Sequence, residues 1–174
     1  MKTNTSTIYT VLKIVFWIIL IGHLIQTGSI IINYFISVFN PNVSNNTFLG
    51  DSSSNLNELG LRHYTSYLSF QIAILLSKAY MAYLAIKIFD KINLSNPFSE
   101  TVANLIVKIS HSALGAGIIA IIAQGHTQWL AKQGFDVVKE WNGGQFLFLA
   151  GIIFIIAQIF KRGIELQQEN ELTI

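Results

Sequence analysis

Four long apolar runs divide the chain, and polar segments separate them. The runs cover about residues 8–39, 64–89, 101–124 and 145–160. Because an α-helix rises about 1.5 Å per residue, roughly 20 mostly apolar residues cross the hydrocarbon core of a bilayer. We therefore predict an all-α, polytopic membrane protein, in which residues 1–174 form a single bundle of four transmembrane helices.

Charged residues lie mostly between these runs and predict an orientation. If the N-terminus is cytoplasmic, only Arg62, Lys132 and Lys139 lie on the outer side. The positive-inside rule then places both termini in the cytoplasm, with a cytoplasmic turn at 90–100, a tail at 161–174 and outer loops at 40–63 and 125–144. The cations on the cytoplasmic side would be Lys2, Lys13, Lys87, Lys91, Lys108, Lys161 and Arg162.

The outer segment 125–144 alternates apolar and charged residues. Its apolar members include Trp129, Leu130, Phe135, Val138 and Trp141. This alternation predicts a helix or broken helix in the headgroup zone, and a lid over a ligand is the alternative interpretation.

Composition agrees with a membrane protein and excludes several kinds of chemistry. Hydrophobic residues make up 52% of the chain and charged residues 11%, outside the range of soluble domains. The net charge of +2 and the scattered cations argue against direct nucleic-acid binding. The chain has no cysteine, which excludes disulfides and thiolate metal sites. We expect no resident metal or cofactor, and the first run is too long for a cleaved signal peptide.

Polar residues inside the runs recur at helical spacing and form stripes. We predict that the stripes of the first three helices meet in one polar seam, which the fourth helix closes against lipid. The first run offers Gly22, His23, Gln26, Ser29 and Asn33, the second Tyr67, Gln71 and Lys78, and the third Asn104, Lys108, His111 and Gly115. The candidate ligand-binding residues are Lys78, Lys108, His111, Gln71, His23 and Gln26.

Lys78 and Lys108 lie well inside the runs, and no run contains an Asp or Glu to pair with them. Lys108 is close enough to the cytoplasmic end for its stem to reach the headgroups. Lys78 lies deeper, and we interpret it either as a neutral or water-solvated lysine or as a site for an anionic ligand, such as a lipid phosphate or a carboxylate. His23 and His111 can be hydrogen-bonded core residues, haem ligands or a pH switch.

Small residues at four-residue spacing follow in the third run, at Ser112, Ala116 and Ala120. Such residues let helix backbones approach closely. They predict packing within the chain, and a homodimer face is the alternative.

The second connection contains NPFSE, a typical helix start. Asn96 can cap the third helix, Pro97 suits its first position, and Glu100 complements its positive end. Together with the C-terminal IFKRGIELQQENELTI, this segment resembles the uncharacterised bacterial four-span family known as domain of unknown function 2975. The matching residues are Asn96, Pro97, Phe98, Ser99, Glu100, Phe160, Lys161, Arg162, Gly163, Glu165, Leu166, Glu169, Glu171, Leu172, Thr173 and Ile174. The resemblance covers nearly the whole chain, which departs from the common form at Thr101 and Val102 and in its long Asn-rich outer loop.

The resemblance implies an integral membrane protein, here of the bacterial cytoplasmic (inner) membrane, from a family to which no enzyme activity is attached and whose members are often encoded beside a small helix-turn-helix protein. The sequence also lacks an HExxH motif, paired carboxylates and a Ser/His/Asp set at usable depth, which argues against a hydrolase. We expect a non-enzymatic signalling component that senses something in the bilayer or outer space and binds a cytoplasmic helix-turn-helix regulator; a small transporter or anionic-lipid-binding protein is the alternative. The candidate partner-binding residues are Asn96, Pro97, Phe98, Glu165, Glu169, Glu171, Leu172 and Ile174.

Overall fold

The protein is a set of four long α-helices. A computed structural model describes residues 2–39, 60–92, 98–135 and 140–171. The helices are α1 (Lys2–Phe39), α2 (Leu61–Lys91), α3 (Glu100–Lys132) and α4 (Gly143–Glu171). Each is long and apolar enough to cross a membrane, which confirms the all-α class and indicates a multi-pass membrane protein.

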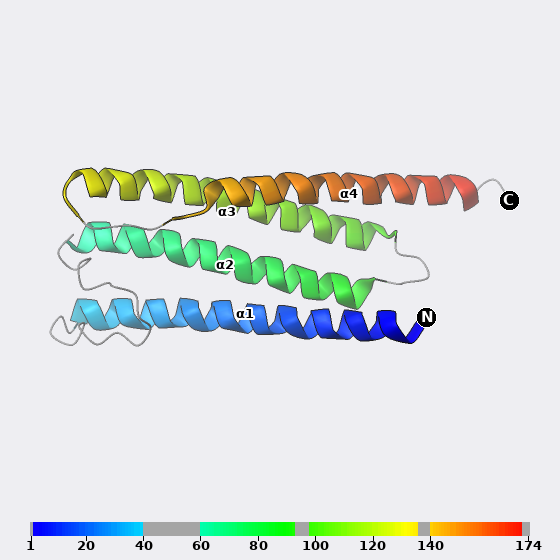
Figure 1. Ribbon diagram of the computed structural model, residues 1–174, viewed down its shortest axis with the longest axis horizontal. Helices are drawn as coiled ribbons and strands as arrows, with labels where there is room; N and C mark the ends of the chain where they lie inside the picture. The colour runs from blue at the N-terminus through cyan, green and yellow to red at the C-terminus, as the bar shows by residue number, and fades with distance from the viewer. Residues whose placement is uncertain (1, 40–59, 93–97, 136–139, 172–174) are drawn as a thin grey trace.

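The helices pack mainly in chain order: α1 on α2, α2 on α3, and α3 on α4. Figure 1 shows them side by side, with the start of α1 and the end of α4 at the same end of the molecule. We call this end the terminal end and the other the opposite end. Since α1 packs chiefly on α2, most of its apolar side chains are exposed, as expected for a surface that lipid covers.

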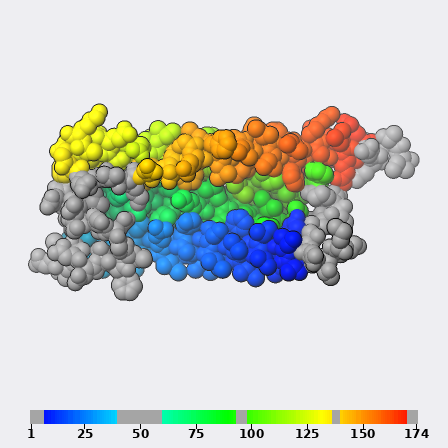
Figure 2. All heavy atoms as spheres, in the orientation of Figure 1, coloured from blue at the N-terminus to red at the C-terminus, as the bar shows by residue number. Residues whose placement is uncertain are grey.

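The fourth helix is displaced along the molecule relative to the third. A Cβ built on Gly143, the first residue of α4, would lie 3.2 Å from the backbone nitrogen of Ile121 and 3.3 Å from the carbonyl oxygen of Gly117. These residues precede the end of α3 by 11 to 15 positions, or about 16–22 Å along the helix axis. The first turn of α4 therefore lies beside the middle of α3, and its far end projects beyond the start of α1 (Figure 2).

Small residues allow this close packing of α3 on α4. Ala113, Ala116 and Ala120 are fully buried, and a Cβ on Gly117 would lie 2.7 Å from a methyl carbon of Leu147. The Ser110 hydroxyl donates a 2.9 Å hydrogen bond to the carbonyl of Ala150. The predicted stripe of small residues thus packs within the chain, because it meets α4.

The predicted interfacial segment 125–144 is partly inside the protein. Residues 125–132 continue α3, where Leu130 is fully buried, and Trp141 is only 4% exposed. Leu130 and Trp141 therefore face the protein core at the opposite end, with Tyr64, Tyr67 and Leu68. The headgroup depth of this segment stays a prediction. Trp129 is 45% exposed, and Val138 lies outside the described residues.

The third helix begins later than NPFSE alone predicts. Its first residue is Glu100, and the Val102 N–H donates to the Ser99 hydroxyl at 3.4 Å. The N-cap is therefore Ser99 and not Asn96, since a cap must immediately precede the first helical residue. Asn96 and Pro97 lie outside the described residues, and Glu100 does lie in the first turn as predicted.

Candidate functional site: a cavity at the start of α4

A cavity of about 400 Å³ lies between α1, α2 and the start of α4. Its polar and charged lining residues are Gln26, Gln71, Lys78, Glu140, Asn142 and Gln145, and its other lining residues are Ile74, Leu75, Trp141, Phe146 and Leu149. This volume is in the range of small-molecule sites, roughly 300–1,000 Å³. The cavity follows from the displacement of α4, whose first turn faces α2 across it.

Gln71 is the most buried polar residue of the cavity. Its side chain is 6% exposed, yet it makes no hydrogen bond to another residue in the part of the chain that the structure describes. The amide of a residue with so little access to solvent gains free energy from a hydrogen-bond partner in the cavity. Because Gln71 lines the cavity, the occupant of the cavity can supply that partner.

Lys78 lies two helical turns from Gln71 on the same face of α2 and is half-buried. Its ammonium nitrogen lies 5.6 Å from the centre of the Phe146 ring, close enough for a cation–π interaction. Within the described residues Lys78 forms no ion pair. The ring thus stabilises the cation without occupying its hydrogen-bond donors.

The first turn of α4 adds a second positive field. The N–H groups of Gln145 and Phe146 donate to the carbonyl of Asn142, which has the left-handed φ of 56° that asparagine tolerates. The first N–H groups of a helix have no intrahelical acceptor, and the helix dipole places about half a positive charge there.

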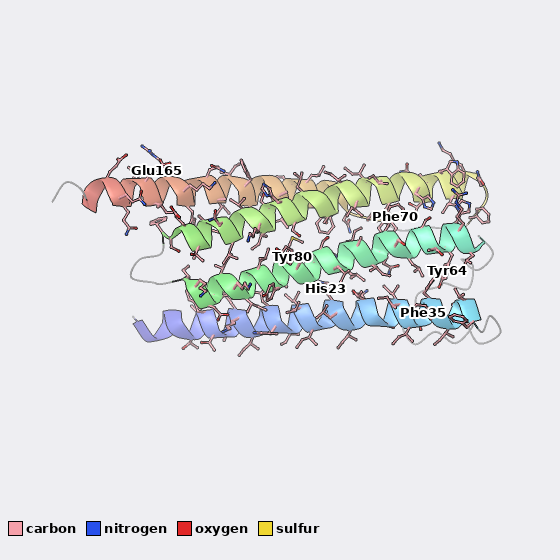
Figure 3. The ribbon with its side chains drawn as sticks, turned by 180° about the vertical axis from the view of Figure 1, so that it is seen from behind. His23, Phe35, Tyr64, Phe70, Tyr80 and Glu165 are labelled. Atoms are coloured by element: carbon pink, nitrogen blue, oxygen red, sulfur yellow. The ribbon has the colours of Figure 1, made fainter. Side chains whose placement is uncertain are left out.

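The predicted seam is only partly assembled. The structure brings Gln26, Gln71 and Lys78 together at the cavity, but Lys108 and His111 are exposed on α3. The expectation that the stripe of α3 joins the seam is wrong, because Ala113, Ala116 and Gly117 occupy the side of α3 that meets its neighbours. His23 lies between α1 and α2 without lining the cavity (Figure 3).

At the terminal end, the turn before α3 contacts α4. The Phe98 ring lies 5.3 Å from the Phe160 ring, and a Cβ on Gly163 would lie 2.6 Å from a carbon of Phe98. A side chain at position 163 would therefore displace the Phe98 ring from α4. The two predicted partner-binding segments, the turn and the tail, meet through this contact.

The tail is a continuation of α4, which stays helical through Glu171. Glu165 and Glu169 are exposed, and Glu165 accepts a 2.6 Å hydrogen bond from Arg162. Figure 3 shows Glu165 pointing away from the other helices. Leu172 and Ile174 lie outside the described residues, as does the side chain of Glu171.

Several contacts had no recognisable signal in the sequence. Glu140, Trp141 and Asn142 reach the cavity from a segment whose pattern indicates an outer loop. At the terminal end, Lys13 of α1 pairs with Asp90 of α2, 77 positions away. Among the described residues no group of three or more His, Asp or Glu is placed to hold a metal ion.

Comparison with known families assigns the chain to a family. A family described as "Protein of unknown function (DUF2975)" matches residues 47–174. The chain belongs to the DUF2975 family. No curated protein and no solved structure matches the chain. The match is narrower than the predicted resemblance over nearly the whole chain, because α1 ends at Phe39, before the matched DUF2975 region begins.

Most of the cavity and all of the terminal-end contact lie in the DUF2975 region. Gln71, Lys78 and Gln145 belong to it, and so do Phe98 and Gly163. Gln26, from α1, is the one lining residue outside it among those that the structure describes.

Proposed function

We propose that the protein is a non-enzymatic signalling component of the bacterial inner membrane, which binds a ligand in the cavity and a cytoplasmic regulator at the terminal end. The main support for this proposal is that α4 contributes to both sites. The helix that lines the cavity with Gln145, Phe146 and Leu149 also carries Phe160 and Gly163, on which the turn packs. Since α4 is a single helix, a shift of its first turn would also move the terminal-end surface.

The orientation belongs to the same proposal. With both termini in the cytoplasm, Lys161 and Arg162 lie where the positive-inside rule favours cations. Anionic headgroups would repel Glu165 and Glu169, so the end of α4 would project into the cytoplasm. The partner that the family resemblance suggests is a small helix-turn-helix protein, whose DNA-binding surface is basic and complementary to these carboxylates.

A photo-crosslinking residue at position 166 tests the partner surface in living cells. Leu166 is 47% exposed at the terminal end, and Ile155, 60% exposed about three turns earlier on α4, is the matched control. We expect a crosslink to a helix-turn-helix protein at 166 and none at 155. The variant Gly163→Val, which displaces Phe98, should reduce the crosslink several-fold.

Absence of any cytoplasmic protein at position 166, or the same crosslinks at 155 and 166, would contradict partner binding and the proposed orientation together. The cavity would then favour the second candidate, a small transporter or anionic-lipid-binding protein that acts through Lys78 and needs no partner. A homodimer would instead give a crosslink between two copies of the chain.

A further inference from the structure

The cavity is built to receive one negative charge together with an apolar chain. Lys78, Gln71 and the first turn of α4 converge on its polar part, while Ile74, Leu75 and Leu149 supply its apolar wall. Glu140 is the only carboxylate among the lining residues that the structure describes. It is exposed, so solvent screens it from Lys78, and it would disfavour a ligand with several negative charges.

The cavity opens sideways rather than being sealed inside the bundle. Five of its lining residues are exposed: Gln26 on α1, Glu140 and Asn142 before α4, and Gln145 and Leu149 on α4. In the described residues α1 and α4 share few contacts, and each carries an exposed lining residue, Gln26 and Leu149, so the cavity opens between them toward the surface that lipid would cover. A molecule already dissolved in the bilayer can enter by this route.

We propose that the cavity binds a singly charged anionic amphiphile, with Lys78 and Gln71 holding its carboxylate or phosphate oxygens and the apolar wall holding its chain. Lys78 donates charge-assisted hydrogen bonds, and the Gln71 amide gains the partner that it lacks within the described residues. The first turn of α4 lines the same cavity through Gln145 and Phe146, so the helix dipole adds a field that favours an anion there. This inference deepens the ligand-binding half of the proposed function and rests on it.

Quenching of Trp141 fluorescence reports binding directly, because Trp141 lines the cavity. The full chain with Trp17→Phe and Trp129→Phe keeps Trp141 as its only tryptophan. It is placed in nanodiscs of zwitterionic phosphatidylcholine and titrated with three brominated probes: a long-chain carboxylate, a phosphatidic acid and an uncharged long-chain alcohol. We expect saturable quenching by the carboxylate or the phosphatidic acid, and the stronger of the two identifies the source of the anion.

Two matched lysine variants separate specific binding from general charge effects. Lys78→Met should weaken anion binding roughly tenfold or more, since hydrogen bonds to charged groups are the stronger ones. Lys108→Met removes the same charge from the exposed face of α3 and should leave binding unchanged. Gln71→Leu should also weaken binding, and it tests the site independently if Lys78→Met does not fold.

Equal quenching by the alcohol and the anions would overturn the assignment of an anionic ligand but leave a ligand-binding cavity in place. No saturable quenching by any probe would overturn ligand binding itself. Equal effects of Lys78→Met and Lys108→Met would overturn the role of Lys78. None of these results depends on a cytoplasmic partner, so the crosslinking experiment tests the other half of the function separately.

Discussion

Replacing Trp141 with alanine should lower the free energy of unfolding by about 3–5 kcal/mol, the usual cost of removing a large buried aromatic side chain. Trp141 is 4% exposed and lies edge-on to Tyr67 of α2, with the ring centres 5.4 Å apart. Its indole N–H donates a 3.3 Å hydrogen bond to the Thr127 hydroxyl of α3. One side chain thus joins two helices to the segment that leads into α4.

Unfolding by dodecyl sulfate in mixed micelles measures this change. Trp17→Ala is the matched control, because Trp17 is 45% exposed on α1, where lipid or detergent covers it. We expect the control to change the free energy of unfolding by no more than about 1 kcal/mol. Equal effects of the two substitutions would mean that Trp141 is not part of the core.

Valine at Gly117 should lower the free energy of unfolding by about 1–3 kcal/mol, the usual cost of overpacking a well-packed interface. The first carbon of the new side chain would lie 2.7 Å from a methyl carbon of Leu147 and 3.2 Å from its backbone nitrogen. The side chain of Leu147 can turn aside, but its backbone cannot. Helix α4 would therefore have to move away from α3.

Gly115 provides the matched control two residues earlier on the same helix. A Cβ at this position meets nothing within 4 Å, so Gly115→Val should change stability by no more than about 0.5 kcal/mol. The same unfolding experiment compares the two variants. A loss in Gly115→Val as large as that in Gly117→Val would point to helix propensity rather than contact with α4.

The apolar runs were sufficient to predict four helices, because length and hydropathy decide which segments can cross a bilayer. They were also sufficient to place Gln71 and Lys78 on one face of α2, since helical periodicity fixes relative direction. Periodicity does not say which face of a helix meets its neighbours. On α3 both a polar stripe and a stripe of small residues were available, and close approach of α4 selected the small residues.

The displacement of α4 could not be predicted from the sequence. Residues 125–144 are polar enough to indicate an outer loop. In the structure the chain at residues 140–142 runs back toward the middle of α3, because Trp141 is buried there and bonds to Thr127. Trp141, Thr127 and Tyr67 are far apart in the sequence, so no local pattern predicts the contacts between them. For this reason the sequence did not predict the cavity or the place of Gln145 in its lining.

A disulfide between positions 121 and 143 tests most directly whether α4 begins beside the middle of α3. The chain has no native cysteine, so Ile121→Cys with Gly143→Cys introduces the only two thiols. Mild oxidation in native membranes should join them, because the backbones approach closely there. The pair Lys132→Cys with Gly143→Cys should stay reduced. A disulfide in the second pair and none in the first would place the start of α4 at the end of α3 and would leave no cavity for a ligand.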